Sequence, residues 1–155
     1  KDWLLSKSLT MIIQIWLYDA ITLDDEIVEY HNNIINDIYK NSEEYKRLSS
    51  NGTIVHNMNL TLYKDGCFLS KHQDGANPQN LCALLIYLNE EYSPEDGGYL
   101  ILNENEKVYP EFGKCVIIDF TKNDIFHEVE KYIGDYGRYA ILDFVSFIED
   151  NEKSE

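Results

Sequence analysis

The chain has 155 residues, 44% of them hydrophobic, which suits one compact domain and argues against a disordered or fibrous protein. A formal net charge of −15, with Arg47 and Arg138 as the two arginines, argues against nucleic acid as a partner, because a phosphate backbone would be repelled. The cysteines (Cys67, Cys82 and Cys115) contain no CxxC pair, which argues against a disulfide framework or structural zinc and favours a reducing, cytoplasmic location.

The first expected element is a short strand over residues 12–18, within an apolar N-terminal stretch. Lys7, Gln14 and Asp19 interrupt this stretch well short of a membrane span, so we predict no transmembrane helix. The sequence begins with Lys1 rather than Met, so the natural amino terminus could have been removed together with any targeting signal. The cytoplasmic location is therefore only an expectation.

A helix is expected next. Thr22 and Asp25 form a capping-box-like start, and the helix should run to about Tyr39. A stripe at helical spacing should face the core, and it comprises Ile27, His31, Ile34, Ile35 and Ile38. His31 is interpreted as a core residue rather than a ligand.

From residue 53 onward the hydrophobic pattern has a period of two, which is typical of strands. Strands are expected at residues 53–63, 67–72, 81–89, 98–102, 114–120, 127–130 and 138–147. Turn sequences separate them, and Gly97-Gly98 is interpreted as one that lets the backbone pass close to its neighbours. The predicted fold is mainly β with an N-terminal helix: a double-stranded β-helix, or cupin-like jelly roll. It would form one domain over residues 1–155, with helical support over about 22–48 and the jelly-roll core over about 53–148.

Two potential metal ligands, His72 and Asp74, lie two residues apart at an expected strand end, where alternate side chains share a face. His127, which opens another strand, is the best-placed third ligand. Two imidazoles and one carboxylate are the ligand set of non-haem iron(II) oxygenases. Zinc would be the commoner guess if the open coordination positions had no second partner.

Arg138 supplies that partner. It begins an otherwise apolar strand, from which it can present a planar fork to a carboxylate inside a barrel. Ala140 and Phe144 share its strand face, as does Leu142, and they are candidates to line the substrate pocket.

Alternation over residues 53–63 separates a polar from an apolar face. The polar face carries Asn57, Asn59, Thr61 and Tyr63, and it suits a substrate channel lined by Asn59 or a solvent-facing surface equally well. His56 falls on the apolar face and is interpreted as a core histidine.

Several motifs follow one another in the strand region. They are Tyr63-Lys64-Asp65-Gly66, His72-Gln73-Asp74, Leu85-Ile86-Tyr87-Leu88-Asn89, Asp96-Gly97-Gly98-Tyr99-Leu100, Val108-Tyr109-Pro110-Glu111-Phe112-Gly113-Lys114, His127-Glu128-Val129 and Gly137-Arg138-Tyr139-Ala140-Ile141. In order and spacing, residues 54–147 resemble the Fe(II)/2-oxoglutarate-dependent oxygenases, in particular their prolyl 4-hydroxylase-like branch.

The resemblance implies that His72, Asp74 and His127 bind Fe(II) and that Arg138 pairs with the distal carboxylate of 2-oxoglutarate. It also implies that Tyr63 and Tyr87 lie near this cofactor, that O2 is the co-substrate, and that ascorbate is a further candidate cofactor. The expected reaction is hydroxylation of a C–H bond on a protein or peptide side chain, with proline preferred.

Two alternatives stay open: a hydroxylase of a free amino acid or small metabolite, and a non-catalytic, cupin-like metal-binding module. The nucleic-acid demethylases of this superfamily carry a second arginine six residues after the first, but Phe144 stands there in this chain. This departure again argues against a nucleic-acid substrate.

Overall fold

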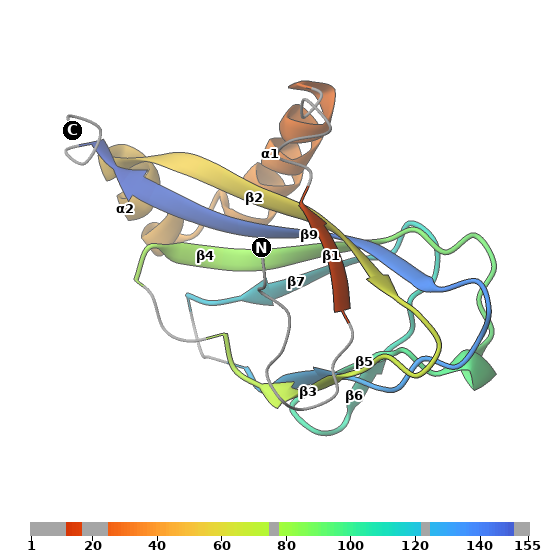
Figure 1. Cartoon of the computed structure of the whole chain (residues 1–155). Helices are drawn as coiled ribbons and strands as arrows, with labels where there is room; N and C mark the ends of the chain where they lie inside the picture. The colour runs from red at the N-terminus through yellow and green to blue at the C-terminus, as the bar shows by residue number, and fades with distance from the viewer. Residues whose placement is uncertain (1–11, 17–24, 75–77, 122–124, 151–155) are drawn as a thin grey trace.

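The computed structural model describes residues 12–16, 25–74, 78–121 and 125–150, and its strands form two antiparallel sheets (Figure 1). The major sheet has the strand order β1 (Ile12–Trp16), β2 (Gly52–Tyr63), β9 (Arg138–Glu149), β4 (Asn80–Tyr87) and β7 (Cys115–Asp119). The minor sheet has the order β3 (Leu69–His72), β8 (His127–Val129), β5 (Leu100–Leu102) and β6 (Glu106–Val108). The predicted jelly roll is confirmed, whereas a single domain over residues 1–155 stays a prediction.

The two longest strands, β2 and β9, form the centre of the major sheet. They pair without a register shift from Gly52 opposite Glu149 to Tyr63 opposite Arg138. Because side chains alternate between the faces of a strand, this register places Thr61, Tyr63 and Arg138 on the face that lines a cavity between the sheets. On the polar face of residues 53–63, Asn59, Thr61 and Tyr63 are buried and Asn57 is half-buried, so this end of the face points into the protein.

Two helices, α1 (Asp25–Tyr39) and α2 (Glu43–Asn51), cover the face of the major sheet that is turned away from the minor sheet (Figure 1). Ser42 caps α2, since its side chain accepts a hydrogen bond from the backbone N–H of Tyr45 at 3.2 Å. The helices and the sheet share one apolar cluster, formed by Ile35, Tyr39, Leu48, Leu81, Cys82, Val145 and Phe147.

The predicted stripe of α1 is partly wrong. His31 and Ile35 are buried as expected and Ile34 is half-buried, but Ile27 and Ile38 are 39% and 53% exposed. Tyr39 takes the place expected of Ile38. The apolar residues of this helix span a wider arc than the sheet covers, so periodicity alone cannot tell which edge of the arc is buried. Thr22 and residues 17–18 lie outside the described residues.

One strand, β6, was not predicted. It is a short strand at the edge of the minor sheet, where β5 is its one partner among the described strands, and its first two residues, Glu106 and Lys107, are exposed. Asn103 and Glu104, in the turn that joins it to β5, have positive φ angles of 48° and 73°. A three-residue charged edge strand has no period-two apolar signal. Among the described residues, no helix is long and apolar enough to cross a membrane.

Candidate active site

The minor sheet brings together the three predicted metal ligands. His72 on β3 pairs directly with His127 on β8, and Asp74 follows two residues after His72. Nε2 of His72 lies 3.3 Å from Oδ1 of Asp74, and Nε2 of His127 lies 3.2 Å from Oδ2. The three donor atoms lie within 4.8 Å of one another, so these residues could hold one metal ion.

Backbone carbonyls orient both imidazole rings. Nδ1 of His72 lies 2.7 Å from the carbonyl oxygen of Ser70, and Nδ1 of His127 lies 3.1 Å from that of Ile125. A carbonyl oxygen only accepts, so in the neutral rings Nδ1 carries the proton and Nε2 aims a lone pair at Asp74. A nitrogen lone pair and a carboxylate oxygen repel each other, so a proton on Nε2 or a metal ion must lie between them. These residue types are metal ligands, so a metal ion can take the place of the protons.

The charge of Asp74 suits the same role. Burial acts to raise the pKa of its carboxyl group, but when the rings of His127 and His72 are protonated, their hydrogen bonds and charge outweigh burial and hold the pKa well below its usual range. Asp74 is therefore an ionised, acceptor-only ligand at neutral pH.

Arg138 lies in the same cavity and is only 1% exposed. Its guanidinium carbon lies 4.7 Å from the ring centre of Tyr63 and 5.0 Å from that of Tyr87, and its Nη2 donates to the Tyr87 hydroxyl at 3.3 Å. Its Nε has no hydrogen-bond partner in the described part of the chain. Burying a guanidinium among aromatic rings without a carboxylate to neutralise its charge costs free energy of folding, so the site suits an incoming anion.

The two tyrosines beside Arg138 are neutral. Burial raises the pKa of Tyr63 to about 12, although the charge of Arg138 acts in the opposite direction. Burial also raises the pKa of Tyr87, again against the charge and hydrogen bond of Arg138. Neither phenol is ionised near neutral pH, so neither neutralises the guanidinium.

Gly98 makes room for Arg138. A Cβ atom at this position would lie 3.1 Å from Cδ of Arg138 and 3.1 Å from Cδ2 of Tyr132, and its backbone has φ +66°. A larger residue would therefore press on the stem of the arginine and also adopt an unfavourable conformation. The sequence predicted that Gly97-Gly98 lets the backbone pass close to its neighbours, but the contact with Arg138 was not predicted.

The cavity has a volume of about 200 Å³ and is otherwise largely apolar. Thr61 and Tyr63 add hydroxyl groups to the metal-ligand cluster and Arg138. The remaining lining residues are apolar: Leu69, Ala83, Leu85, Leu100, Ile118, Val129, Leu142 and Phe144.

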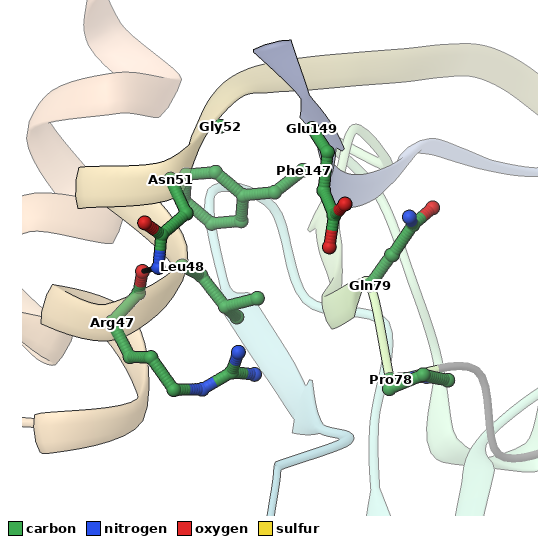
Figure 2. Close-up of a pocket in the computed structure, with 8 residues that line it drawn as sticks. All are labelled: Arg47, Leu48, Asn51, Gly52, Pro78, Gln79, Phe147 and Glu149. Atoms are coloured by element: carbon green, nitrogen blue, oxygen red, sulfur yellow. Dashed lines mark hydrogen bonds between the residues drawn. The ribbon is translucent and has the colours of Figure 1, made fainter. Parts of the chain in front are cut away.

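A second pocket, of about 320 Å³, shares no lining residue with this cavity. Figure 2 shows Arg47 and Leu48 of α2 across it from Pro78, Gln79 and Glu149. Arg47 is already paired, because its Nη2 donates to Glu44 at 2.5 Å. Among the described residues, no group of side chains that could hold a metal ion lines this pocket.

The sequence model of the 2OG-Fe(II) oxygenase superfamily matches residues 58–146, which is more than half of the chain and includes the ligand cluster and Arg138. This chain belongs to the 2OG-Fe(II) oxygenase superfamily. The oxygenase is thus a dioxygenase that uses Fe(II), 2-oxoglutarate and O2. No curated protein matches the sequence.

Solved structures of prolyl hydroxylases share the fold. A Pseudomonas putida prolyl-4-hydroxylase aligns with a TM-score of 0.65 at 19% identity, over 87% of this chain and 70% of that one. A prolyl hydroxylase from Trichoplax adhaerens, in complex with a hypoxia-inducible-factor peptide fragment, gives 0.58 at 22% identity, over 92% and 64%. A prolyl 4-hydroxylase from Phytophthora capsici gives 0.54 at 18% identity, and the oxygenase spans only 50% of its length.

The three residues predicted to line the substrate pocket lie in different places. Phe144 lines the cavity. Asn59 is 1% exposed and donates to the carbonyl oxygen of Asn57 at 3.4 Å, and Ala140 is fully buried, but neither is among the residues that line the cavity. Their predicted contact with substrate stays a prediction.

A second cluster of ligand-type residues was not predicted. His31 is buried and the side chain of His56 is 6% exposed, in keeping with the expected core histidines, but both contact the carboxylate of Asp143. The sequence did contain a signal for a buried charged cluster, because Asp143 is an acidic residue inside the apolar strand β9.

Proposed function

We propose that the oxygenase hydroxylates a side chain of a protein or peptide, with proline preferred, and that His72, Asp74 and His127 hold its Fe(II). The described residues support one ion at this place, since both imidazole lone pairs face one ionised carboxylate. The structural similarity to prolyl hydroxylases, one of them solved with a bound peptide fragment, supports the substrate class.

The observation that carries the cofactor site is the buried charge of Arg138. In the described part of the chain the arginine has aromatic rings and one phenol as partners, and its Nε has none. A carboxylate of 2-oxoglutarate would neutralise this charge with paired hydrogen bonds. Tyr63 and Tyr87 would hold the guanidinium plane in position for it.

Bound Fe(II), 2-oxoglutarate and O2 together supply the oxidising power to hydroxylate a C–H bond. The protein residues orient and protect this chemistry. Ser70 and Ile125 hold the imidazole rings through their carbonyl oxygens. Arg138 would hold the far end of the cofactor. The apolar wall of the cavity, which includes Ile118 and Leu142, excludes water from the reacting centre.

The lining of the cavity favours a residue within a peptide over a free amino acid. The charged groups among the described lining residues are the metal-ligand cluster and Arg138, all with roles assigned above. The ammonium and carboxylate of a free amino acid would find no further charged partner there, at a considerable cost. Within a peptide these groups are amides. The family makes the chain an enzyme, so we set aside the non-catalytic module.

An anaerobic titration tests the metal and cofactor site. Fe(II) and then 2-oxoglutarate are added to the apo-protein, and the weak visible charge-transfer band of the chelate is followed. We expect the band in the wild type and in Asp37→Ala, which removes an exposed carboxylate on α1, and its loss in Asp74→Ala. A band that survives in folded Asp74→Ala would refute the ligand assignment.

The substrate class is tested by 2-oxoglutarate turnover. Proline-containing peptides should stimulate succinate formation and gain 16 Da, an oxygen atom, by mass spectrometry, whereas free proline and other free amino acids should not. Stimulation by free amino acids alone would support the small-metabolite alternative and refute the peptide proposal.

A further inference from the structure

The second ligand-type cluster, formed by His31, His56 and Asp143, lies on the outer side of the major sheet. His31 comes from α1, His56 from β2 and Asp143 from β9. Nδ1 of His31 lies 2.8 Å from Oδ2 of Asp143, and Nδ1 of His56 lies 2.6 Å from the same oxygen. The residue types are those of the active-site cluster, so the composition of the cluster alone cannot distinguish a second metal site from a hydrogen-bonded ion pair.

The distances distinguish the two clusters. In the active site, Nε2 atoms face Asp74 at 3.3 and 3.2 Å, and backbone carbonyls hold the Nδ1 protons away from the carboxylate. In the outer cluster, the Nδ1 atoms themselves meet one carboxylate oxygen at 2.8 and 2.6 Å. These are the lengths of charge-assisted N–H···O hydrogen bonds, in which a proton occupies the space between the atoms.

The second ring nitrogen of His56 decides its protonation. Nε2 of His56 lies 2.7 Å from Oδ1 of Asn32 on α1, while its Nδ1 faces Asp143. An amide oxygen and an ionised carboxylate only accept hydrogen bonds. Both ring nitrogens of His56 must therefore donate, which makes the ring an imidazolium with no lone pair left for a metal ion.

The charges of the surroundings agree with an ion pair. Asp143 is fully buried, and its ion-pair partners among the described residues are His31 and His56. Burial acts to raise the pKa of Asp143, but the hydrogen bonds and charges of the two histidines outweigh it and lower the pKa. Cys82 on β4 also interacts with Asp143, and burial raises the pKa of its thiol to about 12, so it stays neutral.

Two further titratable groups lie next to Cys82. Tyr39 comes from α1 and Asp119 from β7, and both interact with the Cys82 thiol. Burial raises the pKa of Tyr39, so it adds no charge. Asp119 accepts hydrogen bonds from the backbone N–H and hydroxyl of Thr121. Neither residue supplies a cation, which leaves the imidazolium as the counter-charge of Asp143.

We propose that His31, His56 and Asp143 form a buried imidazolium–carboxylate clamp that fastens α1 to the back of the active-site wall and binds no metal ion. Asp143 stands between Leu142 and Phe144, which line the cavity on the opposite face of β9. The clamp therefore joins the helix to the outer side of the strand whose inner side faces the reaction.

Nuclear magnetic resonance of the wild-type protein tests the protonation directly. A long-range ¹⁵N–¹H correlation spectrum at neutral pH should show protons on both ring nitrogens of His56. A neutral His56 ring with a single ring proton would overturn the proposal. That result would mean that the Asn32 amide is rotated by 180° and donates to Nε2 of His56. This measurement needs no variant and does not depend on the identity of the substrate.

Metal stoichiometry tests the exclusion of a second ion. Equilibrium dialysis against Zn²⁺, and anaerobically against Fe²⁺, should give one bound equivalent in the wild type and one in Asp143→Asn, with loss of that equivalent in Asp74→Ala. Two equivalents in the wild type, the second lost in Asp143→Asn and kept in Asp74→Ala, would overturn the proposal.

Thermal unfolding tests the clamp as a fastening. Asp143→Asn leaves the buried imidazolium without its counter-charge, and Tm should fall by roughly 6–20 °C. The matched control Asp37→Asn removes an exposed carboxylate from α1 and should change Tm by less than about 2 °C. Equal Tm values for the two variants would contradict the clamp.

Discussion

Arg138 offers the sharpest test of the cofactor site, through the variant Arg138→Gln. The guanidinium is 1% exposed and lies between the rings of Tyr63 and Tyr87. Glutamine keeps a polar amide, but it is shorter than arginine and removes both the positive charge and the planar fork. The variant therefore tests the contribution of the guanidinium to 2-oxoglutarate binding.

Removing one partner from a buried, hydrogen-bonded charge pair costs about 2–5 kcal/mol. This range corresponds to a 2-oxoglutarate Kd raised by roughly 30-fold to 5,000-fold. A ligand present at 100 times its Kd stabilises a protein by about 2.7 kcal/mol, which raises Tm by roughly 5–11 °C at this chain length. The same concentration should raise the Tm of Arg138→Gln by less than about 4 °C.

The assay is thermal unfolding of the Fe(II)-loaded protein under anaerobic conditions, with and without 2-oxoglutarate. Arg47→Gln is the matched control, because Arg47 is the other arginine of the chain, is half-exposed and pairs with Glu44 outside the cavity. The control should keep the full rise in Tm. If Arg138→Gln keeps it as well, the arginine does not hold the cofactor and the reasoning from its buried charge is wrong.

Three further outcomes follow from the structure. Gly98→Ala should weaken 2-oxoglutarate binding, measured by the anaerobic titration, because its Cβ would lie 3.1 Å from Cδ of Arg138. The control Gly113→Ala has a similar φ of +74° but no atom within 4 Å of its Cβ, so it should leave binding unchanged. Because the pKa of Asp143 is lowered, its ionised form stabilises the fold above about pH 4, and this stabilisation is lost as acid protonates the carboxyl group. In Asp143→Asn, the free energy of unfolding measured by circular dichroism should therefore fall less steeply as the pH is lowered. Phe144→Ala should lower kcat/KM for a peptide substrate by roughly 10–200-fold while uncoupled 2-oxoglutarate turnover stays the same, and an equal loss in both would contradict its place on the substrate side of the cavity.

The residues of the candidate site could be proposed from the sequence because the signals that mark them are local. His72 and Asp74 are two residues apart at the end of a strand, and period two alone places them on one side. Arg138 stands out as a charged residue at the head of an apolar strand. The motif order then indicated the family, and the match over residues 58–146 confirms it.

What the sequence could not determine depends on contacts between distant segments. His31 and Asp143 are 112 residues apart, and only the packing of α1 on β9 brings them together; likewise, only the fold places Gly98 against Arg138. The same holds for the buried edge of α1, where Tyr39 and not Ile38 faces the sheet. Residue types and periodicity identified the chemistry of the His72, Asp74 and His127 cluster, whereas only the tertiary structure brought His31, His56 and Asp143 together. The tertiary structure also decided which nitrogen faces which oxygen in each cluster, and therefore whether the cluster suits a metal ion or a proton.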